Sequence, residues 1–362
     1  MLQIVSVDSL MNLVYVGFMF LFFFYGQRIQ VRIMLINVRR SLGRLLIFRN
    51  AARGRLLERL LHYRSDRGEV EKRADRLIDS FAIPPVSLDP SGIVGKLEHV
   101  LNTYDDYLKA EVRSLATGGT AVEVKNLTNL LEVSIGLDAM FRVVRHYYLL
   151  AQKPGGMLAL AQLQMALPMI MDEAEAYRSA IDAFTEGKPV GDGFGVLVAM
   201  QLASGSESRE LVEDTVVYEV PWQERRLLVV RAKGPGGSVG KPGLAVEKLI
   251  EEAGPVALIV TADAALKLEG EKSAEVVEGV GAAIGGPGTD RYRIEEAAVK
   301  HSVPLFAVVV KMSSKEAIST MASPIRDAVA EASRRVQNAI LDRTKPGETA
   351  IVAGIGNTIG IP

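Results

Sequence analysis

The sequence "TAIVAGIGNTIGIP" at residues 349–362 decides how the C-terminal part of the chain is expected to fold. Its first six residues have the apolar character of a buried strand, and a glycine turn with a single asparagine, Asn357, follows at once. In α/β proteins, a strand that runs into such a turn usually opens a helix and contributes to a ligand site. The sequence ends after this turn, so we expect the matching helix elsewhere in the chain.

Composition limits the kinds of chemistry that the chain can perform. The 362 residues are 48% apolar, which is enough for a sizeable core and for two or three domains. The absence of cysteine excludes disulfides, thiolate metal sites and cysteine nucleophiles, and four histidines leave little room for imidazole metal sites. The net charge of -1 hides an uneven distribution, because residues 1–67 contain eleven arginines, no lysine and three acidic residues.

The N-terminal segment predicts a membrane anchor. Residues 10–25 contain one strongly polar residue, Asn12, and the extended segment 7–26 has about the 20 residues that a spanning helix needs. No basic residue precedes Arg28, which argues against a cleaved signal peptide. By the positive-inside rule, residues 1–27 form a single-pass anchor of the cell membrane, with the N-terminus outside and the remainder in the cytoplasm. A buried core helix is the alternative.

Residues 28–67 alternate arginines with apolar triplets at roughly helical spacing. This pattern predicts a basic amphipathic helix on an anionic lipid surface. Nucleic acid is the less favoured partner for the same charge. The segment could instead be an oligomerisation stalk, and we expect a homo-oligomer.

Residues 68–187 contain helical patterns and no convincing strand. We interpret them as an all-helical spacer or assembly domain without chemistry of its own.

Beyond residue 188, apolar strands alternate with helical patterns, and glycine, alanine and valine become frequent. We expect strands at residues 214–220, 225–233, 255–263, 304–313 and 349–357, with a long loop after residue 263. The alternation predicts an α/β domain over residues 188–362, with a mostly parallel sheet and helices on both faces.

Ligand sites in such sheets lie at the carboxyl ends of the strands. Four features are expected to meet there: the turn at residues 354–357, Asp263, the glycine-rich loop at residues 233–243, and Asp192.

Two of these segments together resemble one unit of a known family. "AGIGNTIGIP" closes the chain and "PVGDGFGVLVAMQL" opens the domain, whereas in the hydrogenase maturation endopeptidases and the related spore germination proteases the corresponding strand and helix are continuous. The "LIVTADA" strand and the late "SPIRDAVAEASRRV" helix occupy similar places. The resemblance implies a circular permutation, with the missing helix from Gly193 onward.

This resemblance implies a membrane-tethered hydrolase, and within that class a peptidase acting on a protein or peptide. Asp192 and Asp263 match the acidic ligands of the endopeptidases, and the two could hold a divalent metal ion or share a proton to activate water, with Asn357 beside them. The family histidine is missing, so a loop carboxylate such as Glu271 would replace it. Alternatively, each aspartate only caps a following helix, and Asn357 only stabilises its turn.

The chain also resembles, over its C-terminal domain, an uncharacterised archaeal membrane-anchored family described as a domain of unknown function. The segments that carry this resemblance are "GDGFGVLVA", "AKGPGGSVGKPG", "DAALKLEGEKSAEVVEGVGAAIGGPGTDRYRIEE" and "VAGIGNTIGI". It implies no particular activity.

A different hypothesis is a non-catalytic module that binds a nucleotide or another anionic ligand. Glycine-rich loops can present backbone N–H groups to an anion, and arginines at a helix start favour the same charge. The residues concerned are Lys233, Gly236, Gly237, Lys241, Gly354, Gly356, Arg291 and Arg293. Solvated turns are the alternative for both loops, and a structural membrane oligomer is a third hypothesis for the whole chain.

Overall fold

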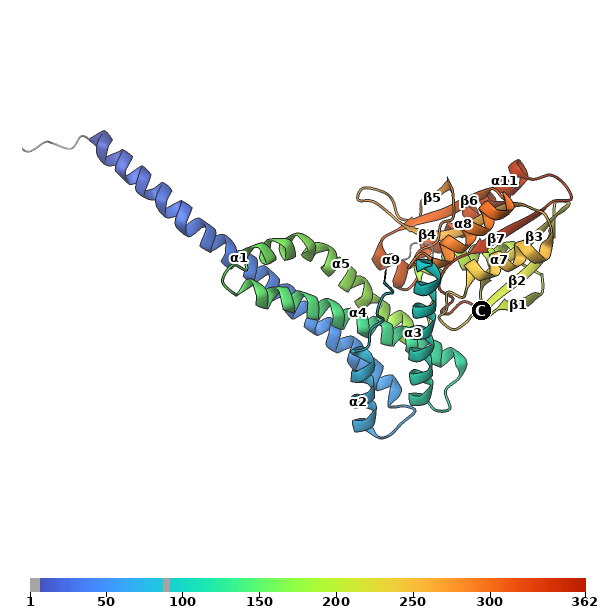
Figure 1. Ribbon diagram of the computed structural model, residues 1–362, viewed down its shortest axis with the longest axis horizontal. Coiled ribbons are helices and arrows are strands. Elements are labelled where there is room, and N and C mark those ends of the chain that lie inside the picture. Colours follow the sequence, from blue (N-terminus) through green and yellow to red (C-terminus); the bar gives the residue numbers. More distant parts are fainter. Residues whose placement is uncertain (1–6, 87–91) are drawn as a thin grey trace, which may run out of the picture. The chain divides into compact units, whose positions relative to one another are not determined.

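The computed structural model describes residues 7–86 and 92–362, and its internal contacts divide the chain into two compact units (Figure 1). The first unit comprises residues 1–50 and 137–174, and the second comprises residues 51–136 and 175–362. Three long helices, α1 (Val7–Leu60), α4 (Ala121–Ala151) and α5 (Met157–Glu186), each contribute one part to each unit.

The first unit is helical and buries apolar side chains of all three helices, among them Val38, Leu45, Val144 and Leu160. Asp138 of α4 is also buried, and its carboxylate is paired with Arg49 and with Arg142. The basic segment predicted at residues 28–67 is therefore not a separate helix. Up to Leu60 it continues α1 without a break, and protein covers some of its apolar side chains, such as Val38 and Leu45.

Within the part of the chain that the structure describes, no helix is both long enough and apolar enough to cross a bilayer. The transmembrane helix predicted over residues 1–27 is thus not supported, and residues 1–6 lie outside the described part.

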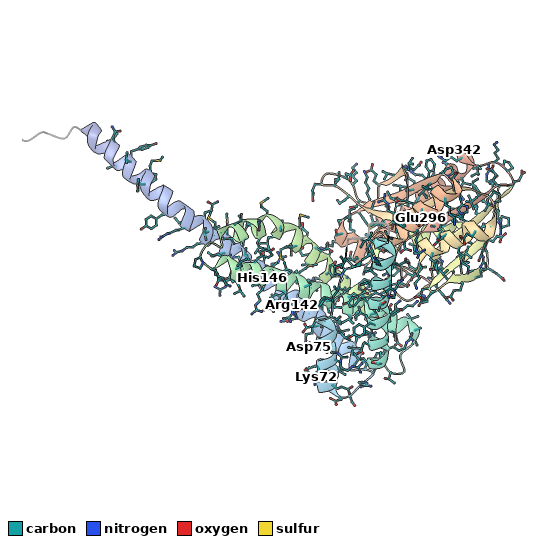
Figure 2. The ribbon with its side chains drawn as sticks, in the orientation of Figure 1. Lys72, Asp75, Arg142, His146, Glu296 and Asp342 are labelled. Atoms are coloured by element: carbon teal, nitrogen blue, oxygen red, sulfur yellow. The ribbon has the colours of Figure 1, made fainter. Side chains whose placement is uncertain are left out.

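The second unit begins with several helices. They are α2 (Arg67–Ile78), α3 (Ile93–Leu115), the first half of α4 and the end of α5. The prediction of a helical region before residue 188 was therefore correct. Asp66 caps α2 by accepting from the backbone N–H of Glu69. Figure 2 shows Asp75 on α2. Arg53 of α1 donates two hydrogen bonds to its carboxylate, at 2.6 and 2.9 Å.

The rest of the second unit contains a seven-stranded sheet with the strand order β1-β2-β3-β7-β4-β6-β5. The strands are β1 (Ser208–Val212), β2 (Thr215–Trp222), β3 (Arg225–Ala232), β4 (Val256–Leu266), β5 (Val276–Val280), β6 (Leu305–Met312) and β7 (Thr349–Gly354). The four central strands, β3, β7, β4 and β6, are parallel.

The sheet is mixed, and the prediction of a mostly parallel sheet was wrong at both edges. β1, β2 and β3 are joined by turns of two residues, which only antiparallel strands can use. Gln223 and Glu224 of the second turn both have positive φ, which matches the twist of a hairpin. β5, in the segment expected to be a loop, pairs antiparallel with β6.

Helices cover both faces of the sheet, as predicted (Figure 1). The short helix α6 (Phe194–Leu202) and α11 (Val329–Arg343) pack on one face, while α7 (Pro242–Ala253) and α8 (Thr289–His301) pack on the other. The remaining elements are the 3-10 turn η1 (Gly191–Gly193) and the short helices α9 (Ser314–Ile318) and α10 (Ser323–Asp327). Strand residues alternate between the two cores, so that Val352 faces α6 and Ile351 faces α7.

The last strand of the chain, β7, lies in the middle of the sheet, between β3 and β4. The loop after β3 leads to α7 on one face, whereas residues 355–362 after β7 run beside residues 187–193, which lead to α6 on the opposite face. Connections that diverge from adjacent parallel strands mark a topological switch point, where α/β sheets usually bind ligands.

Two glycines let α6 approach the sheet backbone closely. A Cβ on Gly195 would lie 2.1 Å from the carbonyl oxygen of Ala262 and 2.3 Å from that of Ile355. A Cβ on Gly354 would lie 2.3 Å from the carbonyl oxygen of Gly195. Any side chain at either position must therefore push the helix away from β4 and β7.

We expect Gly195→Ala to lower the free energy of unfolding of the full chain by about 1–3 kcal/mol, the usual cost of overpacking, although alanine favours helices. The measurement is urea unfolding followed by the fluorescence of Trp222, the single tryptophan, which packs against the core on the α6 side. The control is Gly279→Ala in β5, where a Cβ meets nothing within 4 Å. Equal midpoints for the two variants would contradict the close approach.

Candidate functional site

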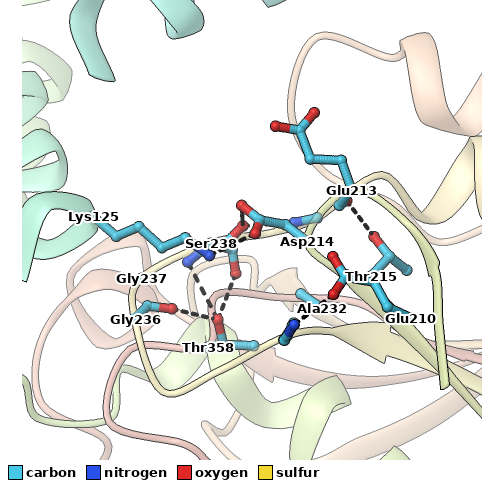
Figure 3. Close-up of polar contacts among 12 residues, drawn as sticks. Lys125, Glu210, Glu213, Asp214, Thr215, Ala232, Gly236, Gly237, Ser238 and Thr358 are labelled. Carbon is cyan, nitrogen blue, oxygen red and sulfur yellow. Dashed lines mark hydrogen bonds and ion pairs between the residues drawn. The ribbon is translucent and has the colours of Figure 1, made fainter. Parts of the chain in front are cut away.

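The loop between β3 and α7 is anchored to the turn after β7. The buried hydroxyl of Thr358 donates to the carbonyl oxygen of Gly236 at 2.7 Å and accepts from the backbone N–H of Ser238 at 3.2 Å (Figure 3). The backbone N–H of Thr358 donates to the carbonyl oxygen of Ser238 at 2.9 Å. The two glycine segments that sequence placed at the carboxyl ends of the strands therefore lie side by side.

Helix α4 holds the other side of the same loop. The backbone N–H of Gly237 donates to Oδ1 of Asn126, and Nδ2 of Asn129 donates to the carbonyl oxygen of Gly237, both at 3.0 Å. One helical turn from Asn129, Lys125 forms an ion pair with Asp214 at 2.7 Å (Figure 3). The backbone of the loop is thus satisfied by side chains and does not depend on a ligand for its conformation.

A cavity of about 430 Å³ opens between these segments. Its walls come from α3, from α4, from the loop at residues 237–241, from the start of α8 and from Asn357. Most of the side chains that line it are charged or carry an amide or a hydroxyl, including Lys109, Lys125, Asn129, Glu132, Ser238 and Asp290. Its size lies within the usual range for small-molecule sites, and charged side chains are numerous among the residues that line it.

Models of known protein families match both the N-terminal and the C-terminal part of the chain. One family model, described as "Protein of unknown function (DUF1512) N-terminal domain", matches residues 12–187, and a second, "Domain of unknown function (DUF1512) C-terminal", matches residues 190–362. The chain belongs to the DUF1512 family. No curated protein and no solved structure matches it, so the resemblance to the endopeptidases rests on the short sequence motifs alone.

Both DUF1512 domains contribute to the cavity. Residues of α3 and α4 fall in the N-terminal match, whereas the loop at residues 237–241 and Asn357 fall in the C-terminal match. The complete site therefore needs residues from both domains of the family.

The lysines that line the cavity are each paired with a carboxylate. Lys109 pairs with Asp105 at 2.7 Å, and Lys241 pairs with Glu213 at 2.6 Å, in addition to the pair between Lys125 and Asp214. These ion pairs neutralise the positive charges that would otherwise attract an anion.

Two carboxylates that line the cavity, Glu132 and Asp290, form no ion pair with these lysines. Among the described residues, the exposed side chain of Glu132 lines the cavity without a hydrogen-bond or ion-pair partner, and the positive charge of Lys109 acts on it from a distance. Surrounding protein atoms and the negative charge of Asp105 raise the pKa of Glu132 to about 7. Asp290 accepts from the backbone N–H of Gly243 at 2.8 Å, but burial still raises its pKa.

The two aspartates expected at the site are close enough to interact electrostatically, but neither lines the cavity. Oδ2 of Asp192 accepts from the backbone N–H of Asn357 at 2.9 Å, so these two residues are neighbours, as predicted. Asp263 is 3% exposed and accepts from the backbone N–H groups of Ala264 and Gly285. Burial raises the pKa of Asp263 well above its usual value, and the charge of Asp192 raises it further. Burial also raises the pKa of Asp192.

Neither aspartate acts as the helix cap considered as its alternative role. Asp263 lies inside β4, which continues to Leu266, and the cap position of α6 is Gly193, without a side-chain hydrogen bond. Asn357 does stabilise its own turn, because its Oδ1 accepts from the backbone N–H of Ile359 at 2.9 Å.

The predicted metal site with Glu271 as third ligand is not found. Within the described residues, no three His, Cys, Asp or Glu side chains are grouped as a metal ion requires. Glu271 instead accepts from Lys311 at 2.6 Å and from the backbone N–H of Leu268 at 2.7 Å.

The basic residues predicted to bind an anion are engaged elsewhere. Arg293 pairs with Glu98 at 2.7 Å and with Glu247 at 2.6 Å, while Arg291 pairs with Glu295. Lys233 is exposed and pairs with Glu210 at 2.5 Å, and it does not line the cavity.

The predicted glycines serve the packing of the turns. A Cβ on Gly356, which has a φ of 137°, would lie 1.8 Å from the carbonyl oxygen of Asp192, and Gly354 contacts α6. Gly236 and Gly237 give their carbonyl oxygens to the hydrogen bonds that anchor the loop.

Sequence reasoning missed the contribution of α4, which was interpreted as a spacer. Lys125, Asn129 and Glu132 recur at intervals of four and three residues, which places them on one face of the helix. This group of polar side chains on one face of the helix was the available signal, although a solvated helix face shows the same pattern.

Proposed function

We propose that the second unit is a binding module for a small polar ligand, which occupies the cavity between α3, α4 and the loop at residues 237–241. The observation that carries this proposal is the position of the cavity at the switch point between β3 and β7. The cavity also contains the carboxylate of Glu132, which has no ion-pair partner among the described residues and is available to a ligand.

The construction of the loop supports the same proposal. Thr358, Asn126 and Asn129 fix the backbone around Gly237 before any ligand arrives, so binding needs little ordering of the protein. Pre-organisation of this kind raises affinity, because less conformational entropy is lost on binding.

We expect at least one compound from a panel of nucleotides, amino acids, amines and sugars to raise the melting temperature of the full chain. At a ligand concentration of 100 Kd, the stabilisation should be about 2.7 kcal/mol. Val239→Trp, which adds bulk at the cavity wall, should abolish the shift. The control is Val280→Trp, at an exposed position of β5 outside the cavity. The proposal fails if no compound binds, or if Val239→Trp binds as well as the original chain.

The neighbouring carboxylates of Asp192 and Asp263 favour a second candidate function, a hydrolase that activates water. A carboxyl group whose pKa is raised by burial and by a second carboxylate can stay protonated near neutral pH while its partner is ionised. Such a pair supplies an acid and a base, and the resemblance to the maturation endopeptidases points to a peptide substrate.

This candidate predicts a change in the pKa of Asp263 together with a change in activity. Asp192→Asn removes a negative charge but keeps an oxygen for the N–H of Asn357, so the pKa of Asp263 should fall, yet stay above its usual value because of burial. The pKa is measured by carbon NMR of labelled aspartate, and peptide cleavage by mass spectrometry, with and without divalent ions. Asp192→Asn and Asp263→Asn should each reduce cleavage at least about 100-fold.

Asp327→Asn, at an exposed position of α10, is the matched control and should change neither quantity. Absence of cleavage by the original chain, or an unchanged pKa of Asp263 in Asp192→Asn, would remove the hydrolase from consideration.

We also propose that the N-terminal part of α1 associates with an anionic lipid surface. It exposes large apolar side chains, including Val14 (66% exposed), Phe18 (65%) and Ile29 (55%). Exposed arginines follow at Arg28, Arg32, Arg39 and Arg40. Apolar contact and positive charge on one helix are the two contributions that bind peripheral helices to anionic bilayers.

The full chain should sediment with vesicles that contain phosphatidylglycerol, more weakly with pure phosphatidylcholine, and less as salt increases. Val14→Asp combined with Phe18→Asp should reduce binding at least about 10-fold. Val280→Asp with Val299→Asp is the control, because both positions are exposed outside α1. Self-association that is lost in the double variant, without any binding to vesicles, would identify a second copy of the chain as the partner and would refute the proposal.

A further inference from the structure

We propose that the ligand of the cavity carries a positively charged organic amine, which pairs with the carboxylate of Glu132. This inference rests on the proposed function, the binding of a small polar ligand in the cavity. The glycine-rich loop and its lysines suggested an anionic ligand, whereas this inference is that the ligand is a cation.

The charged side chains that line the cavity do not all balance one another. Lys109, Lys125 and Lys241 each have a carboxylate partner at 2.6–2.7 Å. Glu98, which also lines the cavity, is paired with Arg293 at 2.7 Å. What remains of the described charges that line the cavity is negative, at Glu132 and at Asp290.

One face of α4 presents two hydrogen-bond acceptors, the amide oxygen of Asn129 and the carboxylate of Glu132. Nδ2 of Asn129 donates to the carbonyl oxygens of Lys125 and Gly237, both at 3.0 Å, and these two bonds define the orientation of the amide. Its Oδ1 is therefore an acceptor, and it accepts no hydrogen bond from the described residues. Glu132 lies three residues further along the same helix face.

An ammonium group matches these acceptors chemically. It has three N–H donors and no acceptor, so a carboxylate and an amide oxygen from one helix face can satisfy two of them. A charge-assisted hydrogen bond to Glu132 is roughly twice as strong as a neutral one. A phosphate or carboxylate in the same place would instead meet an unpaired carboxylate, and like charges brought together at a site oppose binding.

The structure favours an organic cation over a calcium ion. Calcium takes six to eight oxygen ligands, and several of them are usually carboxylates of the protein. In the described chain, no three acidic, histidine or cysteine side chains converge in this way, at the cavity or elsewhere. The cavity also has a volume of about 430 Å³, which suits a small organic molecule.

The test is isothermal titration calorimetry on the full chain with probes matched in shape and different in charge. The amines are 1,4-diaminobutane, lysine amide and tyramine, each compared with its N-acetyl analogue. AMP and citrate serve as anions, and magnesium serves as the metal ion. At pH 8 at least one amine should bind, and its N-acetyl analogue should bind at least about 10-fold more weakly, since charge-assisted bonds contribute this much.

Variants assign the effect to Glu132. Glu132→Gln should weaken binding of the amine about 10- to 100-fold, whereas Glu207→Gln, an exposed carboxylate outside the cavity, should not. Lys241→Gln should leave amine affinity equal or higher, because it frees Glu213.

Binding to the original chain should also weaken at pH 5.5, where Glu132 is protonated. Melting temperatures confirm that each variant is folded.

The outcomes separate the inference from the proposed function. Binding of AMP, citrate or magnesium without binding of any amine overturns the inference and leaves a ligand site in place. Equal amine affinities of the original chain and Glu132→Gln also overturn it. If no probe binds at all, both the inference and the binding module fail.

Discussion

The hydrogen bond from the backbone of Asn357 to the carboxylate of Asp192 joins segments 165 residues apart, and the rest of the site depends on this junction. Gly195, Gly354 and Gly356 make it possible, since a side chain at any of them would meet a backbone oxygen within 2.3 Å. The turn after β7 is thereby held against the start of α6. Because β7 lies between β3 and β4, the same junction places Thr358 beside the loop that follows β3. One backbone contact thus determines where the cavity can form.

The sequence contained enough information to predict this junction and the elements around it. Strand periodicity and glycine turns identified the four central strands, and the carboxyl-edge rule placed the turn at residues 354–357 beside the loop at residues 233–243. The match between "AGIGN" and "GDGFG" predicted that Asn357 and Asp192 are neighbours, which the structure confirms. These inferences succeeded because each depends on a local pattern or on a rule about parallel strands. Edge strands β1 and β5 lack a comparable pattern, since they are short and mostly exposed, and they were missed.

The cavity itself could not be predicted, because its wall on the α4 side depends on long-range packing. Lys125 meets Asp214 across 89 residues, and Asn129 meets Gly237 across 108. Neither segment alone indicates its partner, and the polar side chains on one face of α4 show only that something polar faces them. The same limit applies to the N-terminal segment, where Asp138 pairs with Arg49 and Arg142. One arginine of the segment that suggested a lipid surface, Arg49, is therefore paired with a buried carboxylate inside the protein.

The charge of the ligand that a site accepts depends on which charged side chains of the site remain unpaired. Sequence composition does not show which side chains are paired. The loop at residues 233–243 has the glycines and lysines of an anion site, yet Lys233 and Lys241 are paired with Glu210 and Glu213 of the neighbouring hairpin. An ion pair that must be broken to admit an anion returns little free energy, because the displaced carboxylate then faces the incoming charge. Among the described residues, Glu132 has no ion pair that must be broken, so a cation can form a charge-assisted hydrogen bond with it. The unpaired carboxylate, rather than the more numerous lysines, therefore determines the charge of the ligand that the cavity can accept.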